Sequence, residues 1–220
     1  MQLPFRLPFR FSARTVLFSA TCDAAERAAC LPTALAPQQF QEALGTPHGL
    51  FFALVAANTA TTNAARLLEQ LALGYRLVPP DVERRLALRA ALNYAEVGPE
   101  FDGALAIGAL VNHTLHLLGV GSARAFHVDE NGRLLALRLA SAAQQPFAAS
   151  DVLLLLGGQL VGAFDPYELA LMLYAHDAED AGRRLLTLAQ RRSTTGALMV
   201  LKPEHRRSAL RSLRDMLRPA

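Results

Sequence analysis

The sequence predicts an α+β sandwich, in which two antiparallel sheets are flanked by pairs of helices. Two observations support this fold class. The predicted elements follow one another as strands, two helices, strands, two helices and a last strand. The chain has 220 residues, of which 52% are hydrophobic and 19% charged, so it can bury a large core and is neither disordered nor fibrous.

The first part of the chain is predicted to be mainly extended. Residues 9–20, rich in Phe, Val and Thr, predict one or two opening strands. Residues 31–47 read as a connection interrupted by prolines. The continuous apolar run 49–56 predicts a central strand, because both of its faces are apolar.

A helix pair follows, and after it the apolar pattern changes to that of strands. Leucines at helical spacing predict a helix over residues 59–73, which Gly74 stops, and a second helix that Pro80 opens. From Gly103 on, turn residues separate four short apolar runs and predict an antiparallel meander. The predicted strands span residues 104–110, 114–120, 123–128 and 134–139.

The last part of the chain repeats this order. Residues 151–156 predict a buried strand, and Pro166 takes the first position of a helix. A second helix is predicted over residues 178–191 and a last strand over 197–201. Pro203 is predicted to open a terminal helix.

The composition also indicates the cellular compartment in which the protein is expected. Two cysteines are too few for a disulfide-stapled secreted domain, and no apolar run reaches the roughly 18 residues of a membrane span. We therefore expect a soluble intracellular protein, in the cytoplasm. The alternative is an organellar, mitochondrial location, because residues 1–22 contain three arginines and no acid; two prolines argue against the amphipathic helix of a presequence.

Two stretches of the chain carry a pattern that resembles a known family. Residues 119–124 read Gly-Val-Gly-Ser-Ala-Arg, and residues 151–160 read Asp-Val-Leu-Leu-Leu-Leu-Gly-Gly-Gln-Leu. They resemble the type 2C serine/threonine protein phosphatases, in which a Val-Gly-Asp-Ser-Arg turn precedes a hairpin and a buried strand runs into Ser-Asp-Gly-Leu. The resemblance implies four layers, αββα, in one domain over residues 1–202, with a family-like core at 49–202.

The resemblance also implies a two-metal site whose ligands are replaced here. The family's Val-Ala-Asp-Gly matches a strand end that reads Val-Ala-Ala-Asn, its Ser-Asp-Gly-Leu matches Gly-Gly-Gln-Leu, and its closing Asp-Asn matches Thr-Gly. The degenerate metal-site positions are therefore Ala57, Asn58, Gly158, Thr195 and Gly196. A vacant cleft is expected around Asn58, Ser122 and Gly158.

These replacements predict a protein without catalytic activity. Mg²⁺ and Mn²⁺ are held by carboxylates and carbonyl oxygens, and a two-metal site needs their charge to activate water and clamp a phosphoryl group. We therefore expect no metal, no cofactor and no catalytic residues, but a pseudophosphatase that acts as a binding or scaffold subunit. The alternatives are an active phosphatase with replaced ligands and a structural RNA-associated subunit that uses arginine-rich termini.

Residues 203–220 predict a basic amphipathic helix. Four apolar residues form a stripe, and arginines occupy much of the remaining surface. Arg207, Arg211 and Arg214 are predicted to contact a protein partner, either within a larger assembly or as a kinase-type signalling protein. RNA or an anionic membrane is the alternative partner. The plainest interpretation of the helix is that its apolar stripe packs on the domain and its arginines face solvent.

Four histidines could in principle hold a metal or act as a base. In a strand, positions three apart point to opposite faces, so His113 and His116 cannot share one ligand set. We therefore expect His48, His113, His116 and His127 to lie in turns and on the surface.

Overall fold

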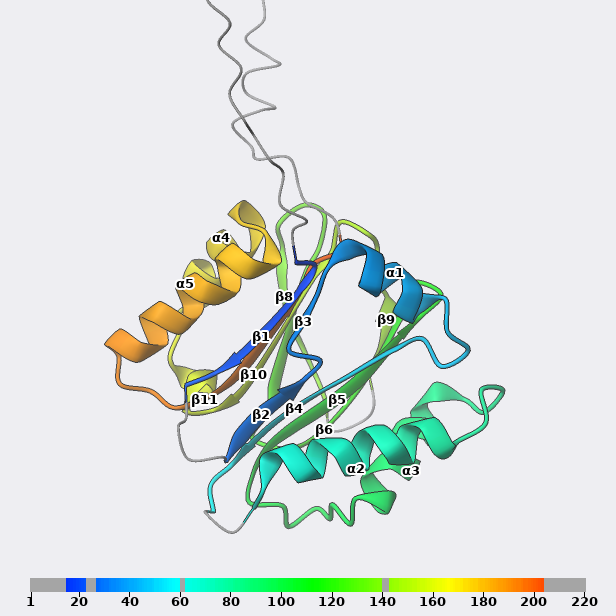
Figure 1. The fold of residues 1–220 in the computed structure, drawn as a ribbon. Coiled ribbons are helices and arrows are strands. Elements are labelled where there is room, and N and C mark those ends of the chain that lie inside the picture. Colours follow the sequence, from blue (N-terminus) through cyan, green and yellow to red (C-terminus); the bar gives the residue numbers. More distant parts are fainter. Residues whose placement is uncertain (1–14, 23–26, 60–61, 140–142, 204–220) are drawn as a thin grey trace, which may run out of the picture.

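Two antiparallel sheets stacked face to face form the centre of the molecule, which we describe from a computed structural model (Figure 1). The structure describes residues 15–22, 27–59, 62–139 and 143–203. One helix pair covers the outer face of each sheet, so the predicted α+β sandwich is confirmed. The predicted terminal helix at 203–220 lies outside the described residues, as do residues 9–14 of the predicted opening strands.

The larger sheet has six strands and the smaller has five. The six-stranded sheet runs in the order β3 (Ala34–Leu35), β1 (Leu17–Thr21), β11 (Gly196–Leu201), β10 (Val152–Gly158), β7 (Arg124–Val128) and β8 (Leu134–Leu137). The five-stranded sheet runs in the order β2 (Ala28–Leu31), β4 (Leu50–Ala57), β5 (Gly103–Val111), β6 (Thr114–Gly121) and β9 (Ala143–Pro146).

Three apolar layers hold the sandwich together. Leu54 and Leu155 belong to the layer between the sheets, whereas their neighbours Val55 and Leu154 face the helices. Because β4 and β10 are covered on both faces, their sequences are continuous apolar runs. The helices are α1 (Pro37–Leu44), α2 (Ala64–Leu77) and α3 (Arg84–Tyr94), then η1 (Gln159–Gly162, a 3₁₀ turn), α4 (Pro166–Ala175) and α5 (Ala178–Arg191).

The strongest patterns are confirmed. The run at 49–56 is β4, an interior strand, and the run at 151–156 is β10. Pro166 is the first residue of α4, which Asp165 caps by accepting from Tyr167 N at 2.8 Å. The second helix of this pair spans Ala178–Arg191, as predicted.

The prediction of a plain connection at residues 31–47 is wrong. The segment contains β3 and α1, and the end of β2. Phe40 is the only buried residue of α1, so the sequence has no apolar period that would mark a helix.

The predicted bounds of the helix pair also need correction. α2 begins at Ala64 and continues through Gly74 to Leu77, and α3 begins at Arg84 rather than at Pro80. A Cβ at Gly74 would lie 2.7 Å from Tyr94 Cβ, so this glycine permits the close approach of α2 and α3 rather than ending a helix.

The predicted meander is wrong in its topology. The strands exist, but β5 and β6 belong to the five-stranded sheet whereas β7 and β8 belong to the other. The chain changes sheets at Gly121, where φ is +69°. The sequence also missed β9, an edge strand whose residues read Ala-Gln-Gln-Pro.

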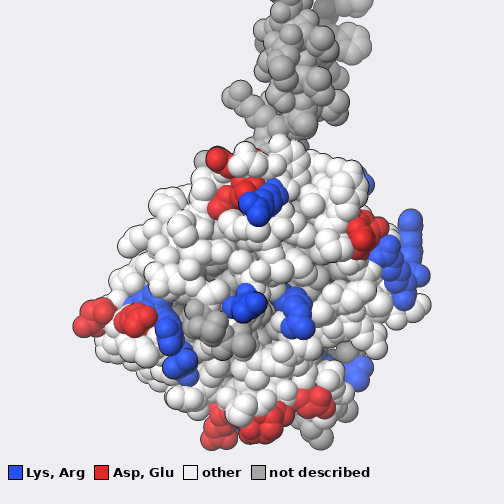
Figure 2. All heavy atoms as spheres, turned by 180° about the vertical axis from the view of Figure 1, so that it is seen from behind, with Lys and Arg blue, Asp and Glu red and all other residues white. Residues whose placement is uncertain are grey.

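Charged side chains are interspersed on the face opposite to the view of Figure 1. Acidic and basic groups both occur there on a mostly uncharged surface, with several acidic groups together at the lower edge (Figure 2). A continuous basic surface, which binding to a nucleic-acid backbone requires, is not seen among the described residues on that face. In the part of the chain that the structure describes, no helix combines the length and apolarity of a membrane span.

Candidate functional site

The ends of four strands, two from each sheet, meet at one end of the sandwich. β4 ends there at Ala57, directly opposite Gly103 of β5. β10 ends at Gly158, opposite Gly196 of β11. The two sheets approach each other at this point, because a Cβ at Gly158 would lie 3.5 Å from Ala56 Cβ. The positions predicted as degenerate metal ligands therefore gather in one place, which we call the strand-end site.

The first half of this site contains hydrogen bonds made by Asn58 and Ser122. Asn58 donates from Nδ2 to Asp102 Oδ1 at 2.7 Å, and its N–H donates to Asp102 O at 3.1 Å. Ser122 N donates to Gly103 O at 2.9 Å. Both Asn58 and Ser122 are exposed. Asp102 was missed by the sequence analysis, although an acid directly before the first residue of a buried strand is a usable signal.

The second half of the site is held by a glutamine. Gln159 Oε1 accepts from Thr195 N at 3.1 Å and lies 3.3 Å from Thr195 Oγ1. The backbone returns the contact, because Gln159 N donates to Thr195 O at 3.0 Å. Thr195 is thus hydrogen-bonded to Gln159, and these bonds join the end of β10 to the start of β11.

Gly158 has a backbone conformation that residues with a side chain rarely adopt. Its φ is +71° and its ψ is −145°. A Cβ there would lie 3.1 Å from both Gly196 Cα and Thr195 O. The local backbone therefore requires a glycine at position 158.

The residues of the strand-end site do not fit a pair of divalent cations. Such cations need several carboxylate or carbonyl oxygens directed at a common point. Ala57 and Gly158 have no side-chain oxygen, and the carboxylate of Asp102 accepts the Asn58 amide. Among the described residues, no three His, Cys, Asp or Glu side chains come together in a group that could hold a metal.

The histidines behave differently from the prediction. His116 and His127 are buried, so their expected surface position is wrong. His127 Nε2 lies 2.9 Å from Asp151 Oδ2, at ion-pair distance but without the alignment of a hydrogen bond. Burial, and secondarily the positive charge of Arg84, lowers the pKa of His116. His113 lies in an exposed turn and is not near the strand-end site.

The buried cysteine is unsuited to be a nucleophile. Burial raises the pKa of Cys30 to about 12, and its Sγ lies 3.6 Å from Leu198 O. A thiol that stays protonated is a weak nucleophile.

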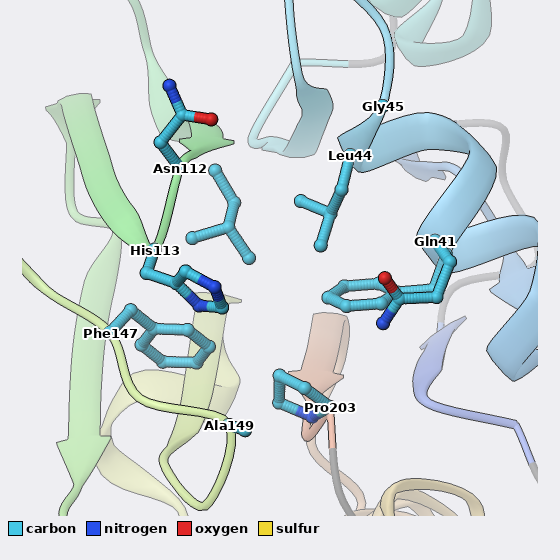
Figure 3. Close-up of a pocket in the computed structure, with 10 residues that line it drawn as sticks. Gln41, Leu44, Gly45, Asn112, His113, Phe147, Ala149 and Pro203 are labelled. Atoms are coloured by element: carbon cyan, nitrogen blue, oxygen red, sulfur yellow. The ribbon is translucent and has the colours of Figure 1, made fainter.

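A cavity of ≈ 370 Å³ with a mixed polar and apolar lining lies at the opposite end of the sandwich (Figure 3). Leu44 of α1 faces His113 and Phe147 across it, and Pro203 lies at its edge. Gln41 and Asn112 supply the amide groups of its lining. Its described lining contains no Asp, Glu, Lys or Arg, so it lacks the carboxylates that hold Mg²⁺ or Mn²⁺ and the guanidinium or ammonium groups that commonly bind a phosphate.

The predicted partner-binding residues, Arg207, Arg211 and Arg214, lie outside the described residues. Their role stays a prediction.

Comparison with solved structures shows that the chain has the fold of type 2C phosphatases. The serine/threonine phosphatase PstP/Ppp of Mycobacterium tuberculosis superposes with a TM-score of 0.64 at 15% identity, over 87% of this chain and 99% of that one. PppA of Pseudomonas aeruginosa, a regulatory component of a type VI secretion system, gives 0.61 at 18% identity, over 85% and 99%. A PstP catalytic domain in complex with two manganese ions gives 0.57 at 14% identity, over 85% and 98%.

No model of a protein family matches the sequence, and no curated protein matches it. The likeness is therefore one of fold.

Proposed function

We propose that this chain is a catalytically inactive phosphatase-like protein that acts as a binding or scaffold subunit through protein contacts. The observation that carries the proposal is the composition of the strand-end site. Where the phosphatase fold would place metal-binding acids, this chain has Ala57, Gly158 and Thr195. Without two bound cations, the fold has no means of activating a water or of neutralising a phosphoryl group.

The local backbone supports the same proposal. Gly158 has a positive φ and no room for a Cβ, and Asn58 and Thr195 are hydrogen-bonded to Asp102 and Gln159. An acid at position 158 would therefore be strained, and the polar groups of Asn58 and Thr195 are engaged within the protein.

The second candidate is an active phosphatase with other metal ligands. The fold favours it, because one of the similar structures holds two manganese ions. Among the described residues, Asp102 is a carboxylate that contacts a replaced position, through its bond to Asn58. A single carboxylate is a poor site for two dications, so we favour the inactive protein.

Addition of millimolar Mn²⁺ or Mg²⁺ is expected to leave the melting temperature unchanged and to produce no phosphatase activity. A cation that binds only the folded state must raise the melting temperature, so the unchanged value reports the missing site. Differential scanning fluorimetry and hydrolysis of a phosphopeptide measure the two quantities. A metal-dependent rise in either would refute the inactive site and support the second candidate.

The partner contact is proposed to include the C-terminal arginines. Arginine pairs bidentately with carboxylates and phosphates, so it suits contact with an acidic surface. Deletion of residues 204–220, or joint replacement of Arg207, Arg211 and Arg214 by Glu, is expected to abolish association with the natural partner while the circular dichroism spectrum stays native. Pull-down of that partner at wild-type strength by the charge-reversed protein would contradict this role.

The third candidate, RNA association through the same arginines, predicts a different observable. Binding to a phosphate backbone weakens steeply with salt, because counterions are released. A steep salt dependence of binding to RNA, lost with the three arginines, would favour it over a protein partner.

A further inference from the structure

The outer faces of α4 and α5 combine exposed apolar side chains with arginines. The two helices lie next to each other on the outer face of the six-stranded sheet (Figure 1). Their inward sides are ordinary: Leu173 and Leu185 are fully buried. On the outward side of α4, however, Tyr167 is 78% exposed and Leu171 57% exposed. Residues four apart lie on the same side of a helix, so these two form one apolar strip.

A groove of ≈ 380 Å³ is lined by residues of α4 and α5, among them Met172, which follows Leu171 in the chain. Its apolar floor consists of Met172 from α4 and Leu188 from α5, both half-buried. Arg183, Arg184 and Arg191 line its walls, together with the single carboxylate of Asp180. The groove therefore joins an apolar base to an excess of positive charge.

Two of these arginines are free to bind a partner. Arg183 donates to Glu179 Oε1 at 2.8 Å and is already paired within α5. Within the described residues, Arg184 and Arg191 make no ion pair, and both are exposed. They are seven residues apart, about two helical turns, with Leu188 between them on the same side.

We infer that this α4–α5 surface, made of Tyr167, Leu171, Met172, Arg184, Leu188 and Arg191, binds an acidic amphipathic segment of a protein partner. An apolar side chain of that segment would fill the groove over Leu188, and carboxylates on either side would pair with the two guanidinium groups. Tyrosine and arginine around an apolar centre are the composition of the strongest parts of protein interfaces. The inference rests on the proposed binding function and adds a second surface to it, one on the folded body of the chain.

Other occupants suit the surface less well. Residues 1–14 contain no acid and residues 204–220 contain five arginines against two acids, so the termini of this chain would be repelled. A second copy in a two-fold contact would bring arginine against arginine. A membrane or an RNA backbone presents negative charge continuously and would meet Asp180, Glu168 and Glu179 as well as the arginines, whereas a peptide segment can place its carboxylates opposite Arg184 and Arg191 alone.

The probe for this surface is a phage-displayed library of peptides about 14 residues long, or about four helical turns. The library is selected on the full chain and counter-selected on Arg184→Glu/Arg191→Glu. The surviving peptides are expected to carry an apolar residue flanked by Asp or Glu. In fluorescence anisotropy, their synthetic forms are expected to bind the wild type and to lose at least about tenfold in affinity with the double variant and with Leu171→Ser.

The matched control is Arg85→Glu/Arg89→Glu, which makes the same charge change on exposed positions of α3. It is expected to leave peptide binding unchanged. Selected peptides without acidic bias, or equal loss of binding in the α3 variant, would overturn the proposal. Phosphatidylserine vesicles and polyuridylate are tested in parallel. Binding of either, lost with Arg184 and Arg191 while no peptide binds, would also overturn it and assign the surface to lipid or RNA.

Failure of this proposal and failure of the proposed function give different results. The peptides carry no phosphate, so their binding does not depend on catalysis. If the peptides fail to bind but the partner is still lost with Arg207, Arg211 and Arg214, the binding function stands and the α4–α5 surface is excluded. If Mn²⁺-dependent activity appears, the inactive site is refuted whatever the peptides do.

Discussion

Replacement of Leu154 by Asp is expected to unfold the protein. Leu154 is fully buried in β10, where it lies opposite Phe126 of β7 and Val200 of β11 and faces the apolar layer under α4 and α5. An ionised carboxylate there would have no partner, and its desolvation costs about 4 kcal/mol or more. Domains are commonly stable by only about 5–15 kcal/mol, so most or all of the free energy of unfolding would be lost. Circular dichroism and denaturant titration measure the loss.

Leu154→Met is the control for this substitution. It conserves volume and adds no charge, so it should cost less than about 1.5 kcal/mol. A Leu154→Asp protein with a native spectrum and an unchanged denaturation midpoint would show that β10 is not an interior strand.

The sequence predicted best the strands that are buried on both faces. β4 and β10 were predictable because burial on both sides leaves an uninterrupted apolar run. α1 was not predictable, because Phe40 is its only buried residue and no apolar period marks the helix. β9 was not predictable either, because an edge strand with Gln144 and Gln145 has no apolar face. The change of sheet after Gly121 was invisible, because a local pattern identifies a strand and not its neighbours.

The candidate site was predictable in its position and not in its contacts. Motif order placed Ala57, Gly158 and Thr195 at strand ends, and the structure brings those ends together. The bonds of Asn58 to Asp102 and of Gln159 to Thr195 join residues more than 30 positions apart, and no local pattern encodes them. The exposed apolar strip on α4 was also missed, because its spacing is the same as that of a buried face.

Replacement of Gly158 by Asp is expected to destabilise the protein without creating a metal site. This substitution returns the acid that the family's Ser-Asp-Gly-Leu would carry. A residue with a side chain at φ +71° and ψ −145° is strained by about 1–3 kcal/mol. Its Cβ would also press against Gly196 Cα and Thr195 O, each 3.1 Å away, so the ends of β10 and β11 must separate. The melting temperature should therefore fall, both with and without Mn²⁺.

Gly162→Asp separates backbone strain from the effect of an added charge. Gly162 ends η1, four residues further along the chain, is exposed, and has no atom within 4 Å of the position of a Cβ. The same substitution there should change the melting temperature little, because neither strain nor collision opposes it. If the Gly158→Asp protein proved as stable as the Gly162→Asp protein and gained a Mn²⁺-dependent rise in melting temperature, the strand-end site would have kept the backbone of a metal site. The chain would then have lost its catalytic acids while retaining the geometry that held them, and the backbone at Gly158 would tolerate an acid despite the closeness of Thr195 and Gly196.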